Sequence, residues 1–336
     1  MATRDTDWDG VRLHVVTGKG GTGKTTVAAA LALALASAGG RVLLMEVEGR
    51  QGIAQLFDCP PLPYGERKVA VAPGTPGQPG GDVYALAADP ESALIEYLET
   101  FYNLRHAGRT LTRLGIVDFV TTIAPGLRDV LLTGKAAEAV RRKGAGGRPV
   151  YDAVVMDAPP TGRIARFLNV SSEVSDLARV GPIRGHADTV QRVIRSPQTV
   201  VHFVTVLEEM PVQETLDGIA ELHSLGGLRA GAIIVNMTRT LALQPDQVQA
   251  AAAGELDQAL LALGLKSAGL NDSPDLAAAL AAEVRDQART AAAQNLQQDR
   301  LDEAGLPCYQ LPWITGRIDL GGLYRLAAAL REQKAA

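Results

Sequence analysis

The hydrophobic residues of the chain gather in short continuous runs that alternate with longer helical patterns. Seven such runs predict buried strands, at residues 11–16, 41–47, 82–88, 151–157, 199–206, 230–237 and 308–313. The first run is followed by a glycine-rich loop, an Ala/Leu-rich helix and the second run. This order is that of a βαβ unit, so the predicted fold is an α/β, doubly wound, mainly parallel sheet with helices on its faces.

Helical patterns occupy most of the remaining chain. The apolar run at residues 27–40 predicts a buried helix that ends at Gly39-Gly40. Further helices are predicted within residues 90–143, with a break at Pro125-Gly126, and within residues 212–224, 245–305 and 320–334. We therefore expect a single domain over residues 1–336, with a helical insertion formed by residues 90–145 and about 170–197.

Part of the predicted insertion carries an apolar helix face. Its residues recur at i, i+3, i+4 and i+7, namely Ile116, Phe119, Val120 and Ile123, and Leu127, Val130 and Leu131 follow the break. The pattern leaves two alternatives open. These side chains pack on the protein's own core, or part of them faces a client or a second subunit.

Composition narrows the partners and the compartment. The 336 residues include 33 basic and 37 acidic side chains, a net charge of −4, whereas a nucleic-acid partner usually requires a basic surface. Two cysteines, Cys59 and Cys308, are too few for a disulfide framework, which favours a reducing cytoplasm. The longest apolar run is shorter than the roughly 20 residues of a spanning helix, so no transmembrane segment is expected.

The glycine-rich loop fits two phosphate-binding motifs. Residues 18–23 match G-x-G-x-x-G, the dinucleotide fingerprint, and Glu46 lies near the distance at which an acid would hold a ribose hydroxyl. Residues 18–25 match G-x-x-x-x-G-K-[ST], the P-loop of ATP-binding proteins. Lys24 and Thr25 favour the P-loop, because its lysine reaches the β- and γ-phosphates and its hydroxyl ligates Mg²⁺. A dinucleotide site needs neither.

A second element supports ATP and Mg²⁺. Asp157 ends the buried run YDAVVMD, where a carboxylate can orient a water on Mg²⁺. Gly162 follows closely and can offer a backbone N–H group to a γ-phosphate. Asp157 alone would be interpreted as a turn residue, but together with a complete P-loop the magnesium role is favoured.

Several stretches resemble one family of ATPases. Lys19 within GKGGTGKTT resembles the additional lysine of the deviant P-loop in ParA-, MinD- and nitrogenase-reductase-like ATPases. Other stretches are similar, in order along the chain, to segments of the ArsA family, the arsenite-pump and tail-anchored-protein-targeting ATPases. They are VYALAADP, APGLRD, DAPPTGRIARFL, and LEEMPVQET with IIVN. The stretch LLMEVEGRQGIAQLF resembles an actinobacterial branch whose members tend to occur as paralogous pairs.

The resemblance implies ATP and Mg²⁺ as cofactors and a role for each matching residue. The phosphates would be held by Gly18, Gly20, Gly21, Thr22, Gly23, Lys24, Thr25 and Thr26. Thr25 and Asp157 would hold Mg²⁺, and Gly162 would belong to the second switch. Asn236 would hydrogen-bond the adenine, and Pro312 would contribute to the nucleotide site.

Lys19, Lys24 and Glu48 would be the catalytic residues. Lys19 would cross a dimer interface to the phosphates of the partner subunit, as an arginine finger does. Because Lys24 already holds the phosphates of its own subunit, we expect Lys19 to be neutralised by the partner's nucleotide rather than within its own subunit.

The sequence departs from the family at both switches. The family's first switch is D-P-A-H-N, whose aspartate positions the attacking water, and the matching run here is EGRQG at residues 48–52. Glu48 can orient a water, but its carboxylate lies one methylene further out, so hydrolysis is expected to be slow or to depend on a partner. Alternatively Glu48 is a solvated loop acid and the subunit is nearly inactive. In the second switch, Arg163 replaces the usual histidine.

These observations predict a cytoplasmic, Mg²⁺-dependent ATPase that works as a homodimer or as a heterodimer with a paralogous ArsA-type subunit. Its nucleotide state would control a client or partner protein. An arsenite site is not expected, because such a site uses several cysteines. A client with a hydrophobic segment stays open, although no methionine lies in the insertion to make an adaptable groove.

Two alternatives remain. One is a weakly hydrolysing regulatory subunit of a hetero-oligomer. The other is a ParA/MinD-like positioning ATPase, which would require a basic DNA-binding face or an amphipathic membrane helix at the C-terminus. The C-terminal stretch GGLYRLAAALREQKAA is short and not strongly basic, which makes the positioning ATPase the weaker alternative.

Overall fold

The computed structural model describes residues 8–75, 77–102, 125–169, 182–239, 243–270 and 274–336. Its strands are β1 (Leu13–Gly18), β2 (Val42–Glu46), β3 (Arg67–Val71), β4 (Asp82–Ala87), β5 (Ala153–Asp157), β6 (Thr199–Thr205), β7 (Ala230–Thr238) and β8 (Cys308–Pro312). They form one sheet in the order β3-β4-β2-β5-β1-β6-β7-β8, parallel except for β3, which runs antiparallel to β4. The predicted doubly wound, mainly parallel α/β fold is thus confirmed.

β3 is the strand that the hydrophobic pattern did not predict. It lies at the edge of the sheet, where Lys68 and Val71 are exposed and only Ala70 of its residues is buried. On this edge Lys68 forms an ion pair with Asp82 of β4. An edge strand is covered less completely than a central strand and tolerates polar residues such as Lys68. It therefore lacks the continuous apolar run of the central strands.

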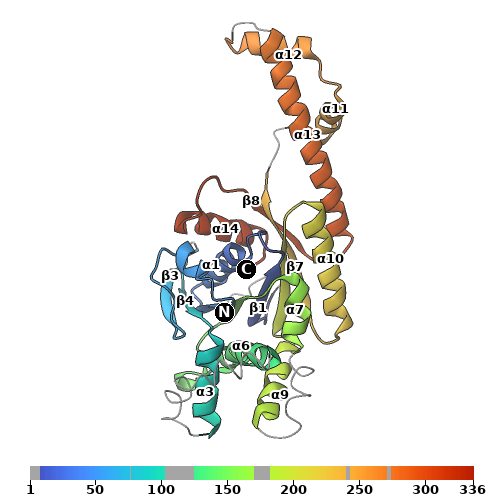
Figure 1. Ribbon diagram of the computed structural model, residues 1–336. Coiled ribbons are helices and arrows are strands. Elements are labelled where there is room, and N and C mark those ends of the chain that lie inside the picture. The colour runs from blue at the N-terminus through green and yellow to red at the C-terminus, as the bar shows by residue number, and fades with distance from the viewer. Residues whose placement is uncertain (1–7, 76, 103–124, 170–181, 240–242, 271–273) are drawn as a thin grey trace.

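The helices are α1 (Lys24–Ala36), α2 (Gly52–Leu56), α3 (Pro90–Tyr102), α6 (Pro125–Arg141), α7 (Thr161–Leu168), α9 (Pro182–Ile194), α10 (Glu209–Ser224), α11 (Pro245–Ala253), α12 (Gln258–Ser267), α13 (Pro274–Asp302) and α14 (Leu320–Glu332). Residues of α1 and α14 belong to the core on one face of the sheet, and residues of α6, α7 and α10 to the core on the other (Figure 1). α1 is apolar around most of its circumference, because it lies between the sheet and α14.

The described part of the insertion comprises α3, α6 and α9 at one end of the molecule (Figure 1). α6 begins at Pro125, a residue that suits the first position of a helix, so the described helix starts where a break was expected. Leu127 and Leu131 pack against α3, and Val130 joins the core beneath the sheet. For these three residues, packing on the protein's own core is the alternative that holds. The face formed by residues 116–123 lies outside the described residues.

The opposite end of the molecule carries an extension formed by α11, α12 and α13, which we call the arm (Figure 1). α13 has 29 residues and supports the other two helices. The arm has a small buried cluster of Val248, Ala251 and Ala288, and Ala277 and Ala281 of α13 are buried as well. Within the described ranges, no helix is both long and apolar enough to cross a membrane.

Candidate functional site

The glycine-rich loop lies at the carboxyl end of the central strands, between β1 and α1. β1 pairs with β5 on one side and with β6 on the other, so the ends of all three strands meet at this edge. α1 begins at Lys24, and Gly23 precedes it in a left-handed conformation, with φ of +83°. The first backbone N–H groups of a helix have no partner within it and favour negative charge, so the loop is suited to phosphate.

The glycines of the loop serve two different purposes. A Cβ atom at Gly18 would lie 2.2 Å from the carbonyl oxygen of Val204, and one at Gly23 would lie 2.4 Å from Nδ2 of Asn236. At these positions the loop packs tightly on β6 and β7. Gly20 and Gly21, in contrast, have no neighbouring atom within 4 Å of the Cβ position. The space beside their backbone is therefore open to a ligand.

Thr25 and Asp157 lie together as the sequence analysis expected of a magnesium site. The Thr25 hydroxyl donates a hydrogen bond of 2.7 Å to Oδ2 of Asp157. The other carboxylate oxygen, Oδ1, is buried and has no hydrogen-bond partner among the described residues. A hydroxyl beside a carboxylate that has one unsatisfied oxygen fits a hard cation and its waters. Lys24 is almost buried beside them, with 8% of its surface exposed.

The environment of Asp157 disfavours its charge. Burial raises the pKa of Asp157 to about 6, and the carboxylates of Glu46 and Glu48 raise it as well. The Thr25 hydroxyl and the Lys24 ammonium act in the opposite direction. A cation at this position would offset both the burial and the neighbouring negative charges. Such a perturbed carboxylate in a ligand site is a common mark of function.

Glu46 has a structural role that excludes the dinucleotide interpretation of this residue. Its side chain is 2% exposed and accepts hydrogen bonds from the backbone N–H groups of Gly52 and Ile53, at 3.3 and 3.2 Å. These groups lie in the first turn of α2, where a carboxylate is favoured. Glu46 therefore anchors the run of residues 48–52, which resembles the first switch, and is not available to a ribose.

The two switch-like segments and the insertion share a polar recess of about 210 Å³. Glu48 and Arg50 line it from the first segment, Arg163 from the second, and Arg128 and Asp129 from α6. Glu48 is 22% exposed, and its Oε2 lies 3.9 Å from the Arg50 guanidinium. The contact is long and the Arg50 side chain is 76% exposed, so the Glu48 carboxylate is able to reorient.

Gly162 is the second residue of α7 and is exposed. Its backbone N–H belongs to the first turn of that helix, so no helical carbonyl satisfies it. This position is compatible with the phosphate contact that the sequence analysis expected.

The expectation for Lys19 is wrong in one respect. Its Nζ lies 2.6 Å from Oε1 of Glu214 on α10, so a carboxylate of the same subunit neutralises it. Both side chains are partly exposed, at 30% and 39%, and such a pair is worth only about 0–1 kcal/mol. The contact with Glu214 was not predicted from the sequence, because 195 residues separate it from Lys19.

A second cavity, of about 250 Å³, lies beside the phosphate loop at the end of β7. Asn236 lines it and donates from Nδ2 to the carbonyl oxygen of Thr22, at 2.9 Å, which fixes its amide. Met237, the next residue, has a positive φ of +60°, an uncommon conformation for a side chain of this size. Strained residues of this kind tend to occur at ligand sites.

The opposite walls of this cavity were not predicted from the sequence. Trp313 lies 46% exposed at its border, with the Arg239 guanidinium 4.6 Å from its ring centre. Thr290 and Gln294 of α13 line another side. Pro312 is exposed and is not among the lining residues, whereas its neighbour Trp313 is. The cavity offers an aromatic face and a fixed amide, which suit a flat heterocyclic base.

Comparison with known proteins agrees with this geometry. The family model of the ArsA ATPases, described as anion-transporting ATPase, matches residues 11–195. The ATPase BagA of Mycobacterium tuberculosis is 52% identical over 325 residues, which cover 96% of this chain and 94% of the relative.

More distant relatives are arsenical pump-driving ATPases. Those of Acidiphilium multivorum and Escherichia coli are each 26% identical, over 91% and 77% of this chain. The matches cover 52% and 44% of these longer relatives. From the extent of the family match, and from the close relationship to a chain of similar length, this protein belongs to the ArsA ATPase family.

Proposed function

We propose that this ArsA-family ATPase binds ATP together with Mg²⁺ at the P-loop, and that it acts as a dimer whose nucleotide state controls the binding of a partner or client protein. The observation that carries the ATP and Mg²⁺ part is the Thr25–Asp157 pair, whose free buried oxygen lies beside an open phosphate loop. When bound, Mg²⁺ would neutralise phosphate charge and favour transfer of the γ-phosphoryl group to water.

Each residue of the site has a role in this proposal. Lys24 and the N–H groups of residues 18–26 hold the β- and γ-phosphates, and Gly162 adds an N–H from the second switch. Thr25 and Asp157 hold the cation and its waters. Glu48 orients the attacking water from the recess between the switches. Asn236 binds the adenine in the cavity at the end of β7.

Hydrolysis is proposed to be slow. Glu48 reaches further than an aspartate would, and its contact with Arg50 is long, so the water is held less rigidly. The same observation favours a second candidate function, a weakly hydrolysing regulatory subunit beside a paralogous ArsA-type ATPase. The two candidates differ in whether turnover rises when a paralogue is added.

The dimer, homomeric or with a paralogous ArsA-type subunit, rests on Lys19. In the proposed closed dimer, Lys19 leaves Glu214 and reaches the partner's nucleotide, where it adds positive charge to the transition state. The ion pair with Glu214 is exposed enough to be opened at low cost. Sedimentation with and without a non-hydrolysable ATP analogue tests this step, and a monomer in both conditions, alone and with a paralogue, would contradict it.

We propose a protein client, with a hydrophobic segment as one possibility, rather than arsenite. Cys59 and Cys308 are free, and no group of three His, Cys, Asp or Glu within the described ranges could hold a metal. A soft metalloid requires a cluster of thiolates. A cytoplasmic location and the absence of a nucleic-acid partner belong to the same proposal, supported by the two free thiols and by the net charge of −4.

Calorimetry with ATP, with and without Mg²⁺, tests the central claim. We expect Lys24→Ala to weaken ATP binding by about 100-fold or more, because a buried hydrogen-bonded charge contact is worth several kcal/mol. Lys68→Ala, on the edge strand far from the loop, is the matched control and should bind as the parent does. Glu48→Gln should keep ATP affinity within a few-fold while phosphate release falls. Binding of NADH but not of ATP would refute the proposal.

A further inference from the structure

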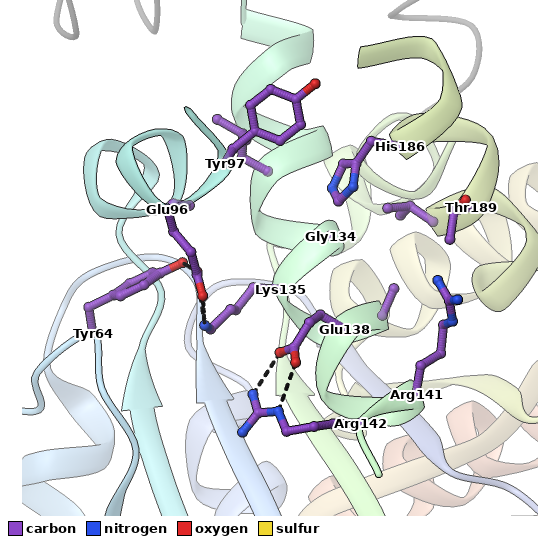
Figure 2. A pocket seen from close by; sticks show the side chains of 14 residues that line it. Tyr64, Glu96, Tyr97, Gly134, Lys135, Glu138, Arg141, Arg142, His186 and Thr189 are labelled. Carbon is purple, nitrogen blue, oxygen red and sulfur yellow. Dashed lines mark hydrogen bonds and ion pairs between the residues drawn. The ribbon is translucent and has the colours of Figure 1, made fainter. Parts of the chain in front are cut away.

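The insertion borders an open cavity that is separate from the nucleotide site. It has a volume of about 370 Å³ and lies between α3, α6 and α9 (Figure 2). This volume is within the range of small-molecule sites in proteins. A client helix of about 20 residues would be about 30 Å long, so the cavity is too small for a membrane-spanning segment.

The body of the cavity is apolar. Ala93 and Tyr97 of α3, Leu131 and Ala137 of α6, and Val190 of α9 line it, and all five are buried. Water in such a chamber has few hydrogen-bond partners, so an apolar ligand would displace it at little cost. The cavity therefore favours a ligand with a hydrocarbon or aromatic body.

α6 is shaped to bring a polar side chain to this chamber. A Cβ atom at Gly134 would lie 2.5 Å from Nε2 of His186, so only a glycine lets the imidazole lie against the helix at this point. Burial lowers the pKa of His186, and the nearby Arg141 lowers it as well, so the ring is neutral at pH 7. A neutral imidazole adds no charge to the wall of the cavity.

The charged groups around the cavity are paired, with one exception. Lys135 bonds both carboxylate oxygens of Glu96 at 2.9 Å, and Arg142 bonds Glu138 and Glu66, each at 2.6 Å. Arg141 lines the same cavity without a hydrogen bond or a carboxylate partner among the described residues. Figure 2 shows its side chain extending from α6 toward Thr189 on α9.

An apolar chamber with a single unpaired guanidinium matches one class of ligand. We propose that the cavity binds a small amphipathic monocarboxylic acid, with its hydrocarbon body between α3, α6 and α9 and its carboxylate on Arg141. Guanidinium binds carboxylate through paired, charge-assisted hydrogen bonds, which makes Arg141 the group that selects the anion. An amine of the same shape would place a second cation beside Arg141 and would bind poorly.

The test uses the full chain without nucleotide, so that it does not depend on the proposed ATPase cycle. Linear monocarboxylates of about four to about twelve carbons, which suit a cavity of this size, are titrated by calorimetry. The alcohols and amines of the same chain lengths are titrated for comparison. We expect one chain length to bind best, and its alcohol and amine to bind at least about tenfold more weakly, as the loss of a charge-assisted bond implies.

Two arginine variants distinguish binding of the acid at Arg141 from nonspecific adsorption to the protein surface. Arg141→Gln should weaken the best acid about tenfold or more and leave its alcohol unchanged. Arg148→Gln removes the same charge from an exposed arginine outside the cavity and should change neither. Both side chains are exposed, so neither variant should impair folding. The proposal is overturned if no acid of the series binds, if acid and alcohol bind equally, or if the two variants behave alike.

Discussion

The sheet and the arm both contain large apolar side chains, which are buried in the sheet and largely exposed on the arm. In the sheet, Phe203 and Met156 are 0% and 1% exposed and lie in a large continuous core. In the arm, α12 contributes no buried residue, and Leu260 and Leu263 are 66% and 64% exposed. The hydrophobic effect acts only on area removed from water, so large apolar side chains stabilise the sheet strongly and the arm very little.

The arm replaces burial with local interactions. α11 begins with a capping box formed by the side chains of Gln244 and Gln247, and the Asp257 carboxylate accepts from the first N–H groups of α12. The Ala-rich sequence of α13 has high helix propensity along its length. We infer that the arm unfolds locally at a lower free energy than the sheet, because few buried contacts oppose its opening.

The largest change in the free energy of unfolding is expected for a substitution in the core of the sheet. Phe203→Ala removes a fully buried ring and should lower the free energy of unfolding by about 3–5 kcal/mol. Urea denaturation followed by circular dichroism measures this loss. A loss below about 1 kcal/mol would mean that the core beside β6 collapses to fill the space, and that the sheet and the arm differ less in stability than we infer.

A smaller effect is expected at the phosphate end of the sheet. The pKa of Asp157 is ordinarily 3.8 and rises to about 6 in the folded protein, so protonation of Asp157 stabilises the folded protein. This contribution is complete below pH 3.8 and is lost as the pH rises through 6, because the unfolded chain then binds fewer protons than the folded one. The rise in the pKa of Asp157 from 3.8 to about 6 corresponds to at most about 3 kcal/mol.

Asp157→Asn should therefore make the nucleotide-free protein more stable than the parent at pH 7, and the difference should shrink toward pH 4. Thermal unfolding between these pH values measures the difference. The same variant should lose the Mg²⁺-dependent part of ATP binding, since a neutral amide does not compensate a cation. A variant less stable than the parent at pH 7 would show that the charged carboxylate is already compensated.

An effect of about 1 kcal/mol is expected where the arm meets the nucleotide site. Trp313→Ala should weaken ATP binding about fivefold, because it removes one aromatic face of the cavity beside α13. The chain has two tryptophans, and the other, Trp8, is buried at 6%. ATP should therefore quench the fluorescence of a Trp8→Phe variant and leave that of Trp313→Phe unchanged. Equal quenching in both would remove Trp313 from the base site.

The smallest effect is expected on the arm itself. Leu263→Ser should change the free energy of unfolding by less than about 0.5 kcal/mol, because the side chain is already in water. Urea denaturation measured beside Phe203→Ala gives the direct comparison. A loss of several kcal/mol would show that Leu263 is covered in solution, for example by a second chain.

Much of the fold and part of the site follow from short stretches of sequence. Buried strands in a parallel sheet carry continuous apolar runs, and seven of the eight strands were predicted from them. β3 was not predicted, because its sequence RKVAV at the edge of the sheet is not a continuous apolar run. The phosphate loop could be recognised because backbone geometry and a lysine at a set spacing suffice to hold phosphate, and residues 18–25 contain both.

The partners of the polar side chains were decided only by the tertiary structure. Lys19 was expected to await a second subunit, yet Glu214 neutralises it from 195 residues away. Glu46 was considered for a ribose, yet it holds the first turn of α2. A charged residue takes whichever opposite charge or N–H group the folded chain places beside it. That placement depends on the order of the strands and on the packing of distant helices, so residue types along the chain do not reveal it.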